Sequence, residues 1–265
     1  MVETLKAASG ATMSLVKLCK EGDLEGVKAA LQSGVDVNTK GELGRTGLIG
    51  AVRYNHSSVV ELLLKTPNID VNQKAFFEDK GGWSALHSAV ARVTRVSKVT
   101  RVTSNDVEVL KLLLNVPNID VNIEDNDGES ALVHAVRGNN LVVLKLLLNV
   151  PSVHMNSVNS NCRSRYYGFT ALHWAVENSV VDIKHNIEVF KLLLNHPSLT
   201  ALTLNQKDKD MWGGTPVLLA VIYNRLEHLA LLVADPRVDL DTRGCEGRSL
   251  EDWARWLFLL ESSAS

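Results

Sequence analysis

The chain has 265 residues, of which 28 are basic and 30 acidic, and its formal net charge at pH 7 is -2. This near balance excludes a strong overall attraction to nucleic acid or to acidic membranes. The three cysteines, Cys19, Cys162 and Cys245, are odd in number and far apart, which indicates reduced thiols and excludes a disulfide framework. The N-terminus lacks the apolar core of a signal peptide, and no apolar run approaches the length of a membrane span. We therefore expect a soluble intracellular protein, located in the cytoplasm or, alternatively, in the nucleus.

The first predicted element is a helix pair over residues 14–40, which follows an N-terminal tail over residues 1–13. Its outer face carries several charged side chains, namely Lys17, Lys20, Glu21 and Lys28. A terminal repeat needs such a polar face because it meets water where an internal repeat meets a neighbour. The pattern predicts an N-terminal capping unit.

The repeating unit is clearest over residues 125–156. A turn over 125–128 is followed by Ser130, whose hydroxyl is expected to cap the N-terminus of a short apolar helix. Gly138 breaks that helix, and a second, leucine-rich helix ends at Pro151. Neither helix is long enough to be stable alone, so each unit must stack on a copy of itself.

Copies of this unit recur along the chain. The same N-cap position is occupied by Thr46, Ser84, Ser130, Thr170, Thr215 and Ser249, each with a glycine two residues upstream. The closing element L-L-L-x-x-P recurs at residues 62–67, 112–117, 146–151 and 192–197. Successive N-caps are 38, 46, 40, 45 and 34 residues apart, and the shortest of these spacings is close to a repeat of about 33 residues. The longer spacings indicate insertions, which we place at 93–105, 157–165 and 179–186.

These motifs resemble those of ankyrin repeat proteins. The family signature T-P-L-H-x-A is matched by S-A-L-H-S-A from Ser84 and by T-A-L-H-W-A from Thr170. The resemblance implies an all-α solenoid of stacked helix-turn-helix units joined by hairpin loops. Five full repeats are expected over residues 41–240. A capping helix and tail are expected over residues 241–265, with an aromatic face at Trp253 and Trp256 that closes the core.

The residues with catalytic potential form no recognisable active site. His87 and His173 occupy the histidine position of the family motif, where the resemblance implies a structural role in bonding neighbouring backbone. The other histidines are scattered, without the spacing of a metal site, and we find no set of nucleophile, base and orienting group. We therefore expect a protein that is not an enzyme, with no cofactor, no metal and no small-molecule substrate.

A binding surface is the alternative to an active site. In ankyrin arrays the hairpin tips and first helices line a concave face, and in this register seven of the fourteen aromatic residues of the chain fall on that face. Aromatic residues and arginine dominate binding hot spots. We therefore predict that this face, centred on repeat units three to six, binds a protein or peptide carrying apolar anchors and acidic groups. The predicted binding residues are Arg45, Arg53, Tyr54, Trp83, Arg92, Arg137, Tyr166, Tyr167, Phe169, Met211, Trp212 and Tyr223. The alternative is that some of these aromatic residues brace neighbouring hairpins.

Two other functions stay open. Basic residues recur at every third position from the end of the preceding helix into the insertion, namely Arg92, Arg95, Lys98 and Arg101. This basic stretch, 92–101, could bind nucleic acid or an anionic lipid. The structural alternative is a solvated, mobile loop. The hairpins that contain Asn72 and Asn122 resemble sites that an asparaginyl hydroxylase modifies in ankyrin proteins, although a structural role in the turn is the default. The balanced charge disfavours nucleic acid and a membrane, and we expect a monomer.

Overall fold

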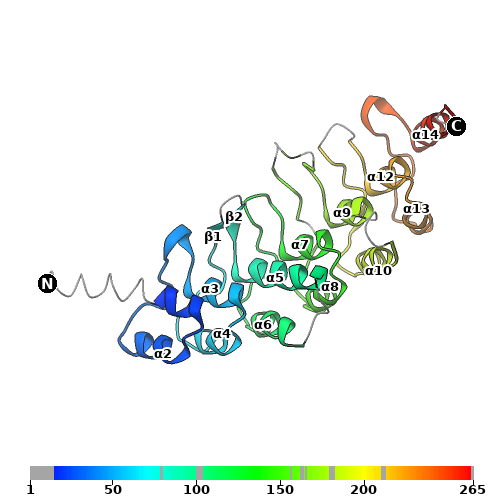
Figure 1. The fold of residues 1–265 in the computed structure, drawn as a ribbon. Helices are drawn as coiled ribbons and strands as arrows, with labels where there is room; N and C mark the ends of the chain where they lie inside the picture. The colour runs from blue at the N-terminus through cyan, green and yellow to red at the C-terminus, as the bar shows by residue number, and fades with distance from the viewer. Residues whose placement is uncertain are drawn as a thin grey trace. The chain divides into compact units, whose positions relative to one another are not determined.

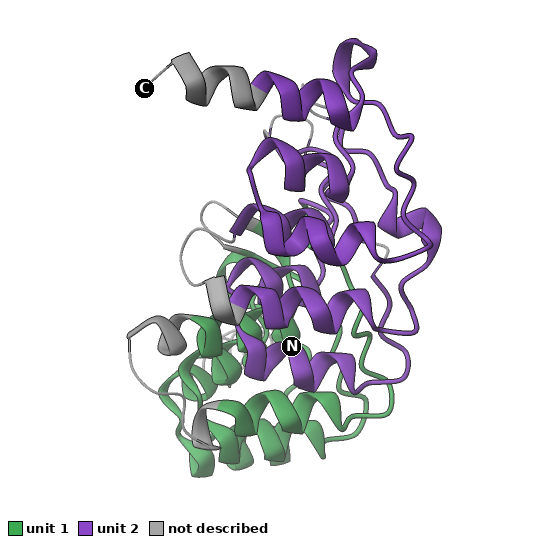
Figure 2. Cartoon of the chain, turned by 90° about the vertical axis from the view of Figure 1, so that its right-hand side faces the viewer, with its two compact units in different colours: residues 1–126 green, residues 127–265 purple. Residues whose placement is uncertain are grey.

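The computed structural model describes residues 15–77, 80–99, 104–155, 157–161, 164, 166–178, 183–209 and 213–263. The chain divides into two compact units, residues 1–126 and residues 127–265, which Figure 2 shows in different colours. None of the described helices is both long and apolar enough to cross a membrane.

The first unit is a stack of helix pairs. A helix over residues 15–21 is followed by α2 (Leu24–Gln32), η1 (Glu42–Gly44), α3 (Gly47–Tyr54), α4 (Ser57–Leu64), β1 (Ala75–Phe77), β2 (Lys80–Trp83), α5 (Ala85–Val99) and α6 (Ser104–Leu114). Helix α3 packs against α5, and α4 packs against both α2 and α6. The first helices of successive pairs therefore form one layer and the second helices form another (Figure 1).

The second unit repeats this arrangement. Its elements are α7 (Ala131–Arg137), α8 (Leu141–Leu148), α9 (Ala171–Glu177), α10 (Ile183–Leu194), α11 (Ala201–Leu204), α12 (Pro216–Ile222), α13 (Leu226–Val233), η3 (Cys245–Gly247) and α14 (Leu250–Ser263). Helices α7, α9 and α12 pack in one row, and α8, α10 and α13 pack in the other. Both units thus have the mostly helical architecture of stacked pairs that the sequence predicts.

The first helices begin where the repeat motif places them. Thr46 accepts a hydrogen bond from the Ile49 amide at 3.3 Å, and Thr215 accepts one from the Leu218 amide at 3.4 Å. Ser130 is different, because its hydroxyl makes no capping bond to α7. In α5 and α9 a histidine at the third helical position bonds the cap hydroxyl. The prediction that Ser130 caps its helix through its side chain is therefore wrong.

The glycine two residues before each cap adopts a positive φ angle, as Gly82 illustrates. Its φ is +80°, and a Cβ built on it would lie 2.8 Å from the backbone nitrogen of Asn126. A side chain at this position would be strained both by the left-handed backbone and by the neighbouring hairpin. The hairpins of the first unit can therefore pack closely only because glycine stands here.

An antiparallel strand pair is added to the helical architecture in the first unit. Ala75 pairs with Trp83 and Phe77 with Lys80, with an irregularity in register between the two pairs. These strands form the stem of the hairpin that precedes α5, and they place Phe76 and Trp83 on the hairpin.

The insertion at 93–105 does not have the loop structure expected for its first part. Helix α5 continues to Val99, and α6 begins at Ser104. The physical reason is that Ala89, Val90 and Val93 recur at helical spacing and are all buried, so the apolar stripe of α5 extends into the insertion. The loop interpretation is therefore wrong for residues 93–99, while residues 100–103 lie outside the described residues. The insertion at 179–186 is likewise helical from Ile183, where α10 begins.

Asparagine side chains bridge successive repeats. Asn72 donates from Nδ2 to the Asn118 carbonyl at 2.9 Å and accepts from the Asp120 amide at 2.9 Å. Asn38 makes the same pair of bonds to Asn68 and Asp70, and Asn205 makes them to Arg237 and Asp239. The turn around Asn72 is instead held by Asp70, whose carboxylate accepts from the Asn72 amide at 3.1 Å. The expectation that Asn72 bonds within its own turn is therefore wrong: its side chain links two repeats.

The C-terminal helix α14 covers the last repeat. Trp253 is 1% exposed and packs with Leu218 and Val221 of α12. Trp256 lies edge-on to Trp253, with ring centroids 5.6 Å apart, and is 41% exposed. One face of α14 therefore buries an aromatic side chain against the core, as the sequence indicates, and the side chains of residues 257–260 lie outside the described residues.

Candidate protein-binding face

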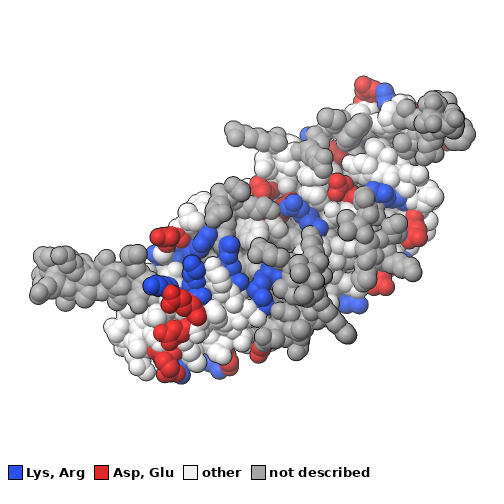
Figure 3. Space-filling view, viewed as in Figure 1, with Lys and Arg blue, Asp and Glu red and all other residues white. Residues whose placement is uncertain are grey.

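In the first unit the predicted surface residues lie on α3 and α5 and on the hairpins before them. Arg53 and Tyr54 are exposed at the end of α3, whereas Arg45, before α3, and Arg92, on α5, are half-buried. In Figure 3 several Lys and Arg side chains gather over α3 and α5. The first helices of this unit therefore present a basic surface, although the whole chain is nearly neutral.

Tyr54 is held in place within this surface. Its ring stacks on His56 with centroids 6.4 Å apart, and the Lys20 ammonium lies 5.7 Å from its centroid. The backbone carbonyl of Lys20 lies 2.9 Å from Nε2 of His56, so the three residues form one connected group. Tyr54 nevertheless remains 47% exposed, which leaves an ordered aromatic side chain and a cation open to a partner.

Trp83 packs within its own repeat and is also partly exposed. It stands at the end of β2 and stacks on His87, with centroids 6.3 Å apart and an interplanar angle of 29°. His87 in turn bonds the Ser84 hydroxyl through Nδ1 at 2.9 Å. Trp83 therefore braces the start of α5, but it is only half-buried and still contributes to the surface.

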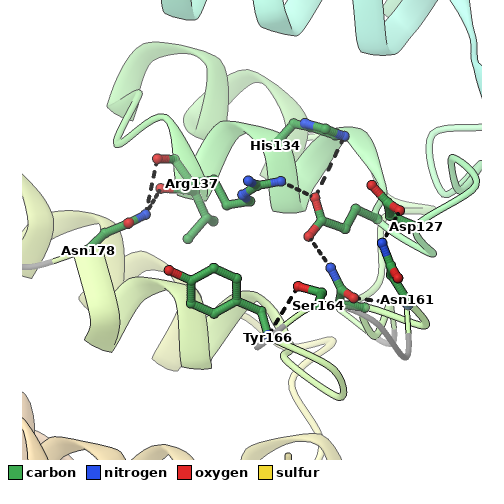
Figure 4. Close-up of polar contacts among 10 residues, drawn as sticks. Asp127, His134, Arg137, Asn161, Ser164, Tyr166 and Asn178 are labelled. Carbon is green, nitrogen blue, oxygen red and sulfur yellow. Dashed lines mark hydrogen bonds and ion pairs between the residues drawn. The ribbon is translucent and has the colours of Figure 1, made fainter. Parts of the chain in front are cut away.

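In the second unit a buried carboxylate organises the surface. Glu129 is 1% exposed, and its carboxylate accepts hydrogen bonds from the Arg137 guanidinium and from Nδ2 of Asn159, the latter at 2.7 Å. His134 Nε2 lies 4.0 Å from the same carboxylate. Figure 4 shows Arg137 and His134 reaching into this cluster from α7. The arrangement pairs a charge that would be costly to bury alone.

Arg137 connects this cluster to an aromatic group. Its guanidinium lies 4.4 Å from the ring centroid of Trp174, and the Trp174 and Tyr166 rings are 4.3 Å apart. The Tyr166 hydroxyl donates to Glu177 at 3.2 Å. The Arg137 side chain is 32% exposed, so a fixed guanidinium lies beside aromatic rings at the surface, a combination typical of binding sites.

Phe169 does not belong to the exposed surface. It is 3% exposed and packs against Tyr166, His173 and Trp174, with ring centroids 5.1, 5.1 and 5.4 Å away. The expectation of an exposed anchor at Phe169 is corrected, because the alternative of bracing describes this ring. The buried Phe169 ring packs edge-on against the Tyr166 and Trp174 rings.

His173 has the structural role that the family resemblance implies. Its Nδ1 bonds the Thr170 hydroxyl at 2.8 Å and the Thr170 amide at 3.1 Å, and its Nε2 lies 3.1 Å from the Gly214 carbonyl. Burial lowers the pKa of His173 to about 4, although backbone hydrogen bonds act in the opposite direction. The imidazole is therefore neutral at physiological pH and serves to join α9 to the next hairpin.

The remaining predicted residues are dispersed along the second unit. Tyr167 is half-buried, with the Lys209 ammonium 5.2 Å from its ring, and Tyr223 is half-buried beside Arg225, 6.0 Å from its ring. Met211 and Trp212 lie outside the described residues. The structure therefore groups Arg137 with Tyr166, and it groups Arg45, Arg53 and Tyr54 within the first unit, but it does not unite the whole predicted set.

The predicted set of binding residues did not include several residues of these surfaces, chiefly Lys20, Glu129, Trp174 and Glu177. Trp174 occupies the variable position of the T-A-L-H-W-A motif, and an aromatic residue there was a signal that could have been used. Glu129 stands one residue before an N-cap, where its sequence neighbours give no sign that it is buried. These surfaces offer cations, hydrogen-bond donors and aromatic rings, which are groups that can bind other macromolecules.

Comparison with known proteins agrees with this architecture. The family model described as ankyrin repeats matches residues 15–99 and 98–201, whereas no curated protein matches the chain. An ankyrin repeat domain from Acinetobacter baumannii is 23% identical with a TM-score of 0.63, and the match covers 83% of this chain and 95% of that one.

The ankyrin repeat domain of Bcl-3, a member of the IκB family, is 21% identical with a TM-score of 0.67, covering 92% of this chain and 97% of that domain. The ankyrin repeat protein EF0377 is 22% identical with a TM-score of 0.65, covering 83% and 96%. At these identities the solved structures support the fold alone, while the family model spans more than half of the sequence. The chain therefore belongs to the ankyrin repeat family.

Proposed function

We propose that this protein is a non-enzymatic intracellular scaffold that binds an acidic segment of a protein partner on its hairpins and first helices. Ankyrin repeat domains are typically protein-binding scaffolds, and this chain adds a particular surface chemistry. The observation that carries the proposal is the basic, aromatic surface of the first unit, where Lys and Arg side chains gather over α3 and α5 (Figure 3). Lys20, Arg53 and Tyr54 are all exposed, and the Lys20 ammonium lies 5.7 Å from the centroid of the Tyr54 ring.

The chemistry of that surface favours an acidic partner. Arginine and tyrosine contribute more binding energy per residue than most other surface residues. A positive surface on a nearly neutral chain also steers a negative partner to one region and disfavours basic partners. The Arg137 and Tyr166 group adds a second place where an acidic or aromatic side chain of a partner fits.

The proposal is tested with a phage-displayed library of random 12-residue peptides, selected against the full chain. Dissociation constants of the selected peptides are then measured by fluorescence anisotropy. We expect acidic peptides, and we expect the Lys20→Glu/Arg53→Glu variant to lose at least tenfold in affinity, which corresponds to about 1.4 kcal/mol.

The matched control is Lys145→Glu/Lys191→Glu. This variant makes the same change in charge at two exposed lysines of the second helices α8 and α10. Its affinity for the peptides should stay within about twofold of wild type, because a change in long-range charge alone can cause a difference of that size. Equal losses in the two variants, or a selection of basic peptides, would contradict the proposal. Circular dichroism melts show whether each variant remains folded.

Salt dependence separates this function from binding of phosphate groups through the stretch 92–101. A nucleic acid or anionic lipid ligand loses affinity steeply with salt because counterions are released from it. A peptide held partly by aromatic contacts should lose less than about tenfold between 50 and 200 mM salt, against a loss of about a thousandfold for a ligand with many phosphate contacts.

A further inference from the structure

The hairpin before α3 holds an exposed leucine in an unfavourable backbone conformation. Leu43 lies within η1 with φ 58° and ψ 23°, which is the left-handed region, and its side chain is 47% exposed. Residues that carry a Cβ seldom adopt this conformation, and glycine adopts it readily. Leu43 therefore has an unfavourable backbone conformation and also exposes an apolar side chain to solvent. Both features are expected to lower the stability of the folded chain.

A second exposed apolar side chain lies beside this turn. Phe76 on β1 is 62% exposed, and β1 contacts η1. A Cβ built on Gly44 would lie 4.0 Å from the Phe76 ring, and one built on Gly81 would lie 3.2 Å from it. The ring therefore rests against two glycines, one from each hairpin, so its position is defined while most of its surface faces solvent. We call Leu43 and Phe76 the tip site.

Basic residues flank the tip site. Lys40 and Lys74 are both exposed, and each stands two residues after a bridging asparagine, Asn38 or Asn72, so they occupy equivalent positions in successive repeats. Neither lysine forms an ion pair with a described residue. Glu42 is the acidic residue of the same turn, which leaves the lysines in excess around the apolar pair.

We propose that the tip site binds a bulky apolar side chain of an acidic protein segment, with Lys40 and Lys74 receiving the acidic groups on either side. This inference rests on the proposed function and extends it, because it names the anchor that the partner must carry. Apolar contact gives the affinity and charge complementarity gives the orientation.

The test uses peptides selected from the same random 12-residue library against the full chain. They should carry a Phe, Leu or Trp next to acidic residues. Phe76→Ala should weaken their binding at least tenfold without lowering the urea midpoint of unfolding, because the ring is mostly exposed. Leu43→Gly should raise the urea midpoint and yet weaken binding at least threefold.

The chain provides a matched control in Glu246. It occupies the corresponding turn η3 (Cys245–Gly247) with φ 57°, so Glu246→Gly should also raise the urea midpoint but should leave the peptide affinity unchanged. A rise in stability without a loss of binding in Leu43→Gly, or unchanged affinity in Phe76→Ala, overturns the inference. So does a selection that yields no peptide dependent on Phe76.

Failure of this inference can be told apart from failure of the proposed function. If Lys20→Glu/Arg53→Glu abolishes binding while Phe76→Ala does not, the basic surface stands and the tip site is wrong. If Lys20→Glu/Arg53→Glu and Phe76→Ala both bind the peptides as wild type does, while the Lys145→Glu/Lys191→Glu control loses binding, both proposals are wrong.

Discussion

His173 shows how one residue of the repeat motif satisfies groups in two places. With the proton on Nε2, the ring donates to the Gly214 carbonyl and accepts from Thr170 through Nδ1. Only the neutral ring can do both, since a charged ring would have no acceptor at Nδ1. The hydrogen bonds of His173 and its burial therefore both favour the neutral imidazole.

The lowered pKa of His173 predicts a loss of stability in mild acid. The pKa rises from about 4 in the folded chain to its ordinary value of 6.5 in the unfolded chain, so the unfolded state binds protons more readily. The stabilisation is complete above about pH 6.5 and is lost as the pH falls towards 4, by up to about 3 kcal/mol. Urea unfolding of wild type and His173→Gln at pH 7.5 and pH 4.5 checks this, because the variant should show a smaller loss. Equal losses would contradict it.

Arg137 has a structural role that must be separated from binding. Removing it leaves the buried Glu129 carboxylate without its cationic partner, so Arg137→Ala should lower the free energy of unfolding by about 3 kcal/mol. Glu129→Gln/Arg137→Met removes both charges and should recover most of that loss. Chemical denaturation of the three proteins measures the effect. A double variant no more stable than Arg137→Ala would show that the charge pair is not the cause.

At the scale of elements, the bridging asparagines join one repeat to the next. Asn72→Ala removes two hydrogen bonds between repeats and leaves the Asp120 amide and the Asn118 carbonyl without that partner. The free energy of unfolding should fall by about 1–3 kcal/mol. Asn115→Ala, at an exposed position after α6 in the same unit, is the control and should change stability by less than about 0.5 kcal/mol. Similar losses in both variants would contradict the bridging role.

The start of each first helix could be predicted because it depends on local chemistry. Thr46 and Thr215 lie directly before their helices, and a hydroxyl beside free amides needs no distant partner. The asparagine bridges could not be predicted in the same way, since they connect residues 30 to 48 positions apart. The helical start of the 93–105 insertion was missed because valine and threonine have weak helix propensity, although Ala89, Val90 and Val93 already had the spacing of a helix.

The candidate surface could be predicted only where it depends on the register of the repeat. Repeat register identifies which positions face outward, and it located Arg53 and Tyr54 correctly on the exposed end of α3. Register alone does not distinguish an exposed aromatic ring from one that packs beneath its neighbours, and so it failed for Phe169. That difference is set by contacts with Tyr166 and Trp174, which only the folded chain brings together.

At the scale of the whole molecule, we propose that binding takes place on the hairpins and first helices of the first unit. The net charge of -2 does not reveal this, because acidic residues elsewhere balance the basic residues over α3 and α5. A nearly neutral scaffold with a local basic surface stays selective, since it attracts an acidic partner only at short range at physiological salt.

Amide hydrogen exchange of the full chain, with and without a saturating selected peptide, tests this claim most directly. Slower exchange is expected in residues 15–21, 41–54, 75–77 and 80–94, which are the hairpins and first helices of the first unit. It predicts little change in the second helices, α4 and α6. Protection confined to α4 and α6, with no change at the hairpins and at α3, would contradict it.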